Sequence, residues 1–273
     1  MPIDFSIEGL KLWGLTPSKI ATKYLHKGNV NILANSIPKS GTHLLERLLY
    51  LLPPFSRKIK GTLFKSNIGS VDFNSLCKHL VNGQFLVSHF AYDKDYLEVI
   101  HKNNLKTIFM IRDPRDIVIS DAHYITNINK KHKLHDYFIN LPSNKERLYK
   151  CMLGNKNPEL FSIAQTLERF YLWIKEKNVL TVKFEDLIGA EGGGSKEIQD
   201  KTVSRILDFV EVDTNYDERS KLLEKIFYSK SKTFHKGKIR QWEKIFDDDD
   251  KSLFKNIAGE WLIKYGYEND YNW

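Results

Sequence analysis

The sequence predicts an α/β fold in which a central parallel sheet is flanked by helices. Short apolar runs rich in β-branched residues alternate along the chain with segments whose apolar positions recur every three to four residues. Strands that alternate with helices favour a parallel sheet with both faces covered. The chain has 273 residues and neither an internal repeat nor a stretch that reads as a domain boundary, so we expect a single domain over residues 1–273.

The first predicted strand is the apolar run from Val30 to Ala34, which ends at the polar pair Asn35-Ser36. A helix is expected from His43 to Leu52, because its leucines recur at helical spacing and Pro53-Pro54 stops its continuation. Further strands are expected at residues 85–88, 107–111 and 178–184, and further helices from Pro114 and along the apolar stripe between Leu160 and Ile174.

Two stretches are predicted to lie at the surface. Gly189 to Ser195 is expected to be a flexible loop because of its glycine content. The acidic run from Asp247 to Asp250 is expected to be a turn or the start of a helix, since carboxylates are favoured at a helix N-terminus.

The composition favours an ordinary globular protein, with 41% hydrophobic and 28% charged residues. No apolar stretch approaches the length of a membrane span, and residues 1–15 lack the pattern of a signal peptide. The two cysteines, Cys77 and Cys151, do not have the spacing of metal ligands, and nothing in the sequence requires a disulfide between them. A reducing compartment is the simpler expectation for two such thiols, so we expect a cytoplasmic protein. The net charge of +8 favours anionic ligands without identifying one.

The segment from Asn35 to Thr42 (NSIPKSGT) lies between a predicted buried strand and a predicted helix. Such a junction points backbone N–H groups and the positive end of the helix dipole at one place, where an anion binds. Gly41 lets the backbone approach a ligand closely, and Lys39 adds a positive charge. The lysine precedes the glycine, whereas a Walker A loop places it afterwards, and this counts against an ordinary ATPase or kinase.

A second segment, Arg112 to Ser120 (RDPRDIVIS), follows the predicted strand at residues 107–111. Ligands of open parallel sheets bind at the carboxyl ends of the strands, which is where Arg112 is expected. An arginine fork matches the geometry of a phosphate group.

These two segments resemble the nucleotide motifs of sulfotransferases that use 3'-phosphoadenosine-5'-phosphosulfate (PAPS). The resemblance implies the P-loop-NTPase-like sulfotransferase fold, PAPS as co-substrate and 3'-phosphoadenosine-5'-phosphate (PAP) as product. It implies that the loop binds the 5'-phosphosulfate and that Arg112 and Ser120 bind the 3'-phosphate. The residues that it assigns to the loop are Pro38, Lys39, Ser40, Gly41, Thr42 and His43.

Two later segments extend the resemblance. Residues 233–242 resemble the family element that closes over the 3'-phosphate, and here the implied nucleotide contacts are Phe234, His235, Lys236 and Gly237. His235 stands where the family has arginine, and Arg240-Gln241 replaces glycine-aspartate. Phe184 begins a segment that resembles the family's Tyr-Glu-Asp-Leu, whose aromatic ring lies near the adenine, and Leu44 stands where many members stack a tryptophan on it.

The resemblance implies Lys39, His89 and Ser120 as catalytic residues. Sulfuryl transfer is expected to be in line, with His89 as the base that takes a proton from an acceptor hydroxyl or amine, because an imidazole titrates near the working pH. The family's lysine two residues before this histidine is replaced by Val87. No metal is expected, because no cluster of His, Cys and Asp has ligand spacing. His123, His132 and His135 are interpreted as solvated surface residues.

Three alternative functions stay open from the sequence. They are a P-loop-type kinase or nucleotide hydrolase, a catalytically inactive protein that binds PAPS or PAP, and a nucleic-acid-binding protein suggested by the positive charge. The basic residues are scattered rather than clustered on one element, so no nucleic-acid partner is expected. The expected partner is a small-molecule or carbohydrate acceptor beside His89, walled by residues 55–73 and 123–149, with a homodimer as an option.

Overall fold

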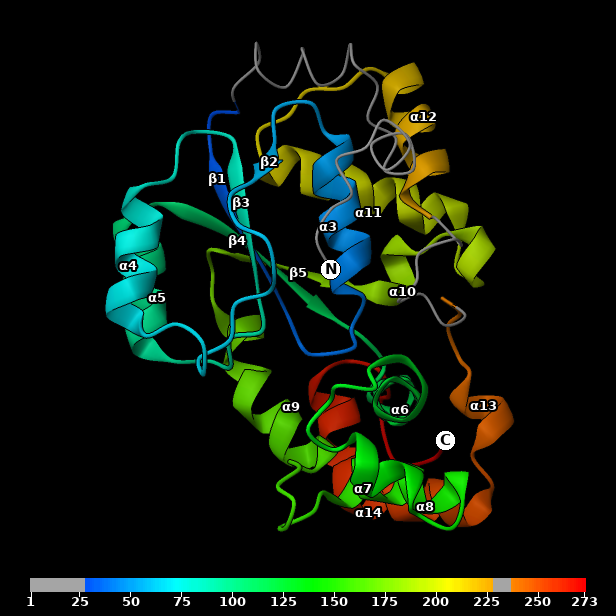
Figure 1. Ribbon diagram of the computed structural model, residues 1–273. Helices are drawn as coiled ribbons and strands as arrows, with labels where there is room; N and C mark the ends of the chain where they lie inside the picture. The colour runs from blue at the N-terminus through cyan, green and yellow to red at the C-terminus, as the bar shows by residue number, and fades with distance from the viewer. Residues whose placement is uncertain (1–27, 228–236) are drawn as a thin grey trace.

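A computed structural model describes residues 28–227 and 237–273. Its centre is one sheet of five parallel strands in the order β2-β3-β1-β4-β5 (Figure 1). The strands are β1 (Asn31–Ser36), β2 (Ser56–Arg57), β3 (Gln84–Ser88), β4 (Leu105–Ile111) and β5 (Val179–Lys183). The predicted α/β class with a central parallel sheet is therefore confirmed.

The middle strand β1 is buried on both faces, which explains its continuous apolar sequence. Ile32 and Ala34 face one hydrophobic core, and Leu33 between them faces the other, because successive side chains of a strand point to opposite sides. The strand extends beyond the predicted bounds to include Asn35 and Ser36. Asn35 still pairs in register with both β3 and β4, and Ser36 pairs with β4.

Four helices cover the face that contains Ile32. They are α3 (Thr42–Leu51), α10 (Phe184–Leu187), α11 (Lys196–Phe209) and α12 (Tyr216–Ile226). Helix α3 packs its leucines on the sheet and ends before Pro53, as predicted. Its N-terminus lies directly after the loop that follows β1, so the predicted strand–loop–helix junction is present.

The other face is covered by α4 (Ser70–Lys78), α5 (Lys94–Lys102), α9 (Ile163–Tyr171) and the 3-10 turn η2 (Leu172–Lys175). Helix α9 begins after Ser162, whose hydroxyl and Gln165 form a capping box. The predicted apolar stripe from Leu160 is therefore helical only from Ile163, because the cap fixes where the helix starts.

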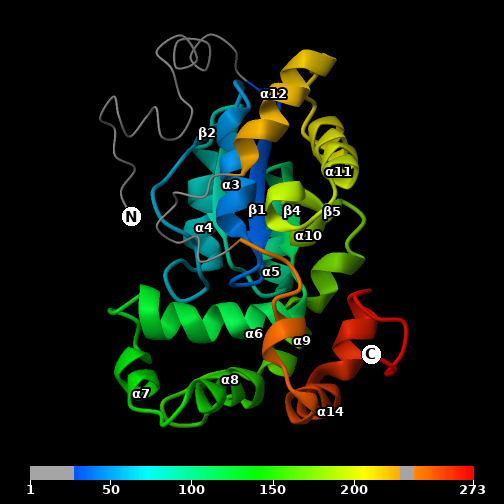
Figure 2. The same ribbon diagram turned by 90° about the vertical axis from the view of Figure 1, so that its right-hand side faces the viewer.

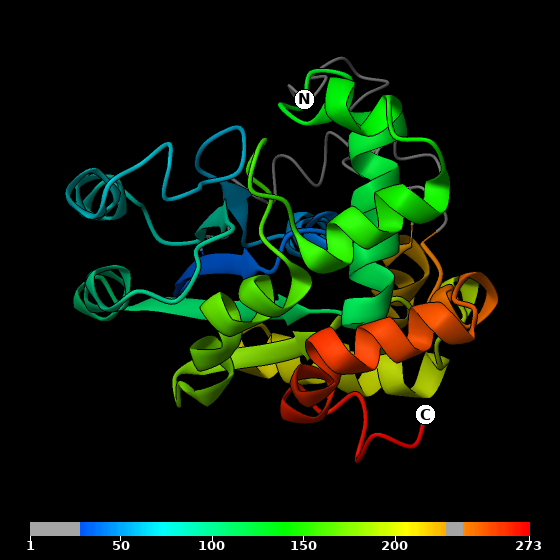
Figure 3. The same cartoon turned by 90° about the horizontal axis from the view of Figure 1, so that it is seen from below.

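A third group of helices lies across the carboxyl ends of the strands (Figures 2 and 3). Helix α6 (Pro114–His123) begins at Pro114 as predicted and continues as the π-helical turn η1 (Tyr124–Ile128). The remaining members are α7 (His135–Ile139), α8 (Asn144–Leu153), α13 (Trp242–Ile245) and α14 (Asp248–Lys264). Asp247 caps α14 by accepting from the Asp250 N–H, which confirms the predicted helix start in the acidic run.

The glycine-rich stretch is more than the flexible surface loop that we predicted. It contains the 3-10 turn η3 (Ala190–Gly192), and Gly192 is buried. The N–H of Ile239 donates to the Gly192 carbonyl at 3.0 Å. A Cβ at position 192 would overlap Ile188, so glycine is required where this segment packs on residues 237–239.

No helix in the described ranges is both long and apolar enough to cross a bilayer. Cys77 and Cys151 are both buried and are not joined to each other.

Candidate active site

The loop between β1 and α3 has the geometry of an anion site. The N–H of Ser40 donates to the Ile37 carbonyl at 3.1 Å and closes a tight turn. Lys39 and Gly41 have positive φ angles of 69° and 91°, and left-handed residues alternating with ordinary ones turn backbone N–H groups toward one side. The first N–H groups of α3 have no intrahelical acceptor, so they are free to bind an anion.

Gly41 brings three segments together. A Cβ at this position would overlap the ring of Phe184, the first residue of α10, so only glycine fits. The Cζ atom of Arg112, which follows β4, lies 4.5 Å from the centroid of the same ring. The loop, Phe184 and Arg112 therefore meet at the carboxyl edge of the sheet. The Phe184 ring is buried between them.

Arg112 and Ser40 each keep a buried polar atom that has no partner among the described residues. The Arg112 Nη1 and Nη2 atoms lie 3.4 Å from the Lys39 carbonyl and 3.1 Å from the Lys238 carbonyl. In the described ranges, neither the Arg112 Nε nor the Ser40 Oγ has a hydrogen-bond partner. Buried donors are normally satisfied, so these two atoms indicate that a polar ligand completes the site.

His89 stands directly after β3 and is held by Ser36 at the end of β1. Its Nδ1 lies 2.8 Å from the Ser36 carbonyl and 3.1 Å from the Ser36 Oγ, and that hydroxyl lies 2.7 Å from the Thr42 Oγ1. A carbonyl oxygen can only accept, so Nδ1 carries the proton in the neutral ring and Nε2 keeps its lone pair. Burial lowers the pKa of His89 to about 4, which keeps the ring neutral at physiological pH.

Asn35 fixes the backbone on both sides of His89, and the sequence did not identify Asn35 as a site residue. Its side chain is fully buried and accepts hydrogen bonds from the Ser88 hydroxyl and the Phe90 N–H, both at 2.9 Å. It also donates to the Phe90 carbonyl at 3.0 Å. The signal for this role in the sequence is that two polar residues, Asn35 and Ser36, end an otherwise apolar strand.

The ammonium of Lys39 lies against α6 and η1. Its Nζ is 3.4 Å from the centroid of the Tyr124 ring. Burial lowers the pKa of Lys39 to about 8, which the charge of Asp121 partly opposes. Burial raises the pKa of Asp121, and the charge of Lys39 opposes that shift. Asp121 and Tyr124 thus lie beside the Lys39 ammonium, and the sequence motif did not reveal either residue.

Two further carboxylates support the Arg112 segment. Asp116 accepts from the Trp242 N–H at 3.1 Å, and its Oδ2 lies 3.5 Å from the Arg112 Nη2. Glu185 accepts from the Asp113 N–H at 2.9 Å, and burial raises the pKa of Glu185 to about 7. Asp113 also caps α6, because its side chain accepts from the Arg115 N–H at 2.9 Å.

Comparison with known proteins identifies the family. A family model described as the sulfotransferase domain matches residues 30–266. The chain belongs to the sulfotransferase domain family. This confirms the resemblance seen in the two nucleotide motifs and the enzyme class that it implied.

Solved structures share the fold of this sulfotransferase. The mouse sulfotransferase SULT7A1, crystallised with PAP, has 19% identity and a TM-score of 0.62, with 90% of each chain covered. A retinol dehydratase in complex with androsterone and PAP has 15% identity and a TM-score of 0.55, over 88% of this chain and 83% of that one. Another retinol dehydratase structure, with retinol and PAP, has 14% identity and a TM-score of 0.54, over 90% and 86%. Comparison with curated proteins gives no significant match.

The other predicted site residues of the sulfotransferase are less closely tied to this set. Ser120 lies half-buried on α6, one residue before Asp121, and no contact links it to Arg112 in the described ranges. His43 is largely exposed at the start of α3, with its Nδ1 3.3 Å from the Glu46 carboxylate. Pro38 is half-buried in the loop itself.

Only part of the predicted third nucleotide segment lies within the described residues. Phe234, His235 and Lys236 lie outside the described residues, whereas Gly237 lies inside them with a φ of 52°. The Arg240 side chain is 73% exposed and has its Nε 3.9 Å from the Glu243 carboxylate.

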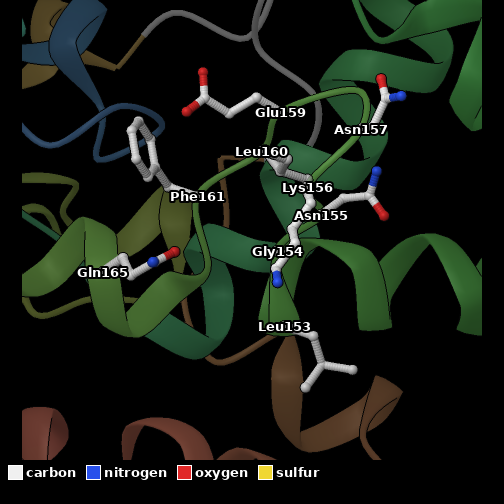
Figure 4. Close-up of a pocket in the computed structure, with 9 residues that line it drawn as sticks. All are labelled: Leu153, Gly154, Asn155, Lys156, Asn157, Glu159, Leu160, Phe161 and Gln165. Atoms are coloured by element: carbon white, nitrogen blue, oxygen red, sulfur yellow. The ribbon is translucent and has the colours of Figure 1, made fainter.

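A separate hollow of about 710 Å³ lies between α8 and α9 of the sulfotransferase (Figure 4). It is formed mainly by the loop that joins these helices, and no residue of the predicted site lines it. Its lining residues are Leu153, Gly154, Asn155, Lys156, Asn157, Glu159, Leu160, Phe161 and Gln165. The predicted site residues Lys39, His89 and Arg112 instead gather at the carboxyl ends of the strands.

Proposed function

We propose that this sulfotransferase moves a sulfuryl group from PAPS to the hydroxyl of a small-molecule acceptor, with His89 as the base. The observation that carries the proposal is the pair of buried donors Ser40 Oγ and Arg112 Nε, which have no partner in the described ranges and lie beside the Gly41–Phe184 contact. Two such donors suit a ligand with two separate anionic groups, as in a nucleotide that bears phosphates at its 3' and 5' positions.

The residues present fit such a nucleotide. The loop from Pro38 to His43 offers N–H groups, the Ser40 hydroxyl and the Lys39 ammonium to a phosphosulfate. Arg112 offers a guanidinium fork, held by the Lys39 and Lys238 carbonyls, to a 3'-phosphate, with Ser120 as a further donor. When bound, PAPS supplies the sulfuryl group and a phosphate leaving group. The PAP in the crystals of the mouse enzyme and the retinol dehydratase supports the same co-substrate here.

His89 takes the proton of the acceptor hydroxyl at Nε2. Its Nδ1–H donates to the Ser36 carbonyl, so the ring accepts at one nitrogen only, and the same carbonyl stabilises the imidazolium that forms. Lys39 stabilises the negative charge that develops on the leaving phosphate oxygen. Both groups are correctly charged between about pH 5 and pH 8, since the pKa of His89 is about 4 and that of Lys39 about 8.

The acceptor is expected to present its hydroxyl on an apolar ring. The Phe64 ring lies beside His89 with 5.1 Å between ring centroids, and Phe64 is 40% exposed. An exposed aromatic ring at the base favours stacking with a phenol or a ring alcohol. The androsterone in the retinol dehydratase complex is a ring alcohol and supports an acceptor of this class.

The test is PAP release from PAPS in the presence of a phenol, a steroid alcohol and a neutral sugar. We expect transfer to at least one ring alcohol, with the sulfate ester identified by mass, and its loss in the Lys39→Ala variant. PAP binding without transfer to any acceptor would instead indicate a nucleotide-binding protein that lacks activity. Absence of PAP binding would reject the proposal altogether.

A further inference from the structure

Arg115 lies next to the nucleotide motif, yet its guanidinium is committed to protein contacts. The side chain is 3% exposed, and its Nε and Nη2 lie 3.0 Å and 2.8 Å from the two oxygens of Asp113. Its Nη1 lies 2.6 Å from the Glu268 carboxylate. Two carboxylates therefore neutralise this arginine, and in the described ranges its Nη1 has the ion pair with Glu268 but no hydrogen bond.

The faces of the same guanidinium contact two tryptophans. The Arg115 Cζ lies 3.8 Å from the ring centroid of Trp242, in α13, and 4.5 Å from that of Trp273, in the stretch after α14. The two indoles are 5.6 Å apart and nearly perpendicular. An arginine that is desolvated against aromatic faces is a strong contact. We call Arg115, Trp242 and Trp273 the arginine–tryptophan cluster.

The cluster holds one end of the segment 238–242, which lies against Arg112. The Ile239 N–H donates to the Gly192 carbonyl at 3.0 Å, and the Lys238 carbonyl accepts from the Arg112 Nη2 at 3.1 Å. The Trp242 N–H donates to Asp116, the carboxylate that pairs with Arg112. Two of the groups that orient Arg112 therefore depend on where this segment lies, and the Trp242 side chain fixes its far end.

We propose that Trp273 is a positioning residue for the 3'-phosphate pocket. Through Arg115 and Trp242 it fixes the 238–242 segment, and with it the Lys238 carbonyl and Asp116, so that the Arg112 fork is aimed at a 3'-phosphate. This rests on the proposed function, because it takes a 3'-phosphorylated nucleotide as the ligand. A nucleotide without a 3'-phosphate has no group for the oriented Arg112 fork to bind. Trp273 therefore contributes to selectivity for 3'-phosphorylated nucleotides as well as to their affinity.

The experiment is calorimetric titration of the wild type, Trp273→Ala and Trp261→Ala with PAP and with ADP, which lacks the 3'-phosphate. Trp261 is a matched control, since it is also half-buried near the end of the chain but packs on Tyr171 and Tyr265. We expect Trp273→Ala to weaken PAP about tenfold, or about 1.4 kcal/mol, with ADP unchanged. Trp261→Ala is expected to leave both affinities unchanged.

Each outcome separates this inference from the proposed function. A wild type without preference for PAP over ADP rejects the proposed function. A wild-type preference that Trp273→Ala retains overturns only the inference, whatever happens to the melting temperature. Should Trp273→Ala not fold, Trp273→Phe keeps an aromatic face and is expected to lose about threefold in the PAP to ADP preference, again with ADP unchanged. An unchanged preference in the folded Trp273→Phe protein overturns the inference as well.

Discussion

His89 can act as a base only in the tautomer that its contacts favour. The Ser36 carbonyl fixes the proton on Nδ1, and the Ser36 hydroxyl links the ring to Thr42 in the anion loop. The base and the anion site are therefore joined by a single residue at the end of β1. Burial lowers the pKa of Lys39, as it lowers that of His89, and brings the loss of the lysine's charge close to the working range of pH.

Replacing His89 with asparagine tests the base. Asparagine can keep a donor toward the Ser36 carbonyl but cannot take a proton, so kcat is expected to fall about 10²- to 10⁴-fold. PAP affinity is expected to stay unchanged by calorimetry. The control is His101→Asn, since His101 is exposed on α5. An unchanged kcat in His89→Asn would show that the proton leaves by another route.

The dependence of kcat/KM for PAPS on pH tests Lys39. The ammonium is present below a pKa of about 8 and is lost as the pH rises through it, so kcat/KM is expected to fall on the alkaline side of about pH 8. Arginine stays charged throughout this range, so the alkaline fall is expected to disappear in Lys39→Arg even where its rate is lower. The same fall in both proteins would assign the titration to another group.

At the scale of elements, the site depends on how the loop after β1 packs between its neighbours. Gly41 caps α3 and lies against the Phe184 ring. The Arg112 guanidinium contacts the same ring. A strand end, a helix start and a short helix from a distant part of the chain thus share one contact. The nucleotide site cannot form unless all three are in register.

Alanine at Gly41 is expected to damage both folding and nucleotide binding. A left-handed alanine costs about 1–2 kcal/mol, and here the new Cβ also overlaps the Phe184 ring. Gly61 is a matched control, because it has the same φ of 91° and an added Cβ meets nothing within 4 Å. Thermal unfolding and PAP titration of the two variants separate the cost of a left-handed alanine from the cost of the overlap with the Phe184 ring. Equal effects of Gly41→Ala and Gly61→Ala would contradict the role of the Phe184 contact.

The sequence was sufficient for the local parts of this arrangement. The buried strand, Gly41 and the proline that starts α6 each follow from short-range rules, and the sequence placed His89 and Arg112 at strand ends and Lys39 in the loop after a strand. The Trp242–Asp116 hydrogen bond joins residues far apart in the chain, which periodicity cannot reveal. His132, interpreted as solvated, is half-buried with its ring 6.2 Å from that of Tyr124, because η1 folds back toward Lys39.

At the scale of the whole molecule, two positive groups and a neutral histidine converge on one edge of the sheet. The strands are parallel, so Lys39, His89 and Arg112 lie at the same end, and α6 lies across it (Figure 2). The net charge of +8 draws anionic nucleotides to the molecule in general, and this edge selects among them.

Chelation tests whether these positive groups are enough. Lys39, Arg112 and the N–H groups of the loop neutralise the charge that a metal ion neutralises in phosphoryl transfer. No group of three or more acidic, histidine or cysteine side chains in the described ranges could hold a metal. We therefore expect kcat to be unchanged in excess EDTA. Activity lost in EDTA and restored by magnesium would contradict this expectation.

The most direct test of the central claim is calorimetric binding of PAP, with ADP as the comparison, to the wild type and to Arg112→Ala. Arg205→Ala, at an exposed arginine on α11, is the matched control. We expect the wild type and Arg205→Ala to prefer PAP, and Arg112→Ala to lose at least about tenfold of that preference while remaining folded. Equal binding of both nucleotides to the wild type, or a preference that survives Arg112→Ala, would contradict a 3'-phosphate pocket at Arg112.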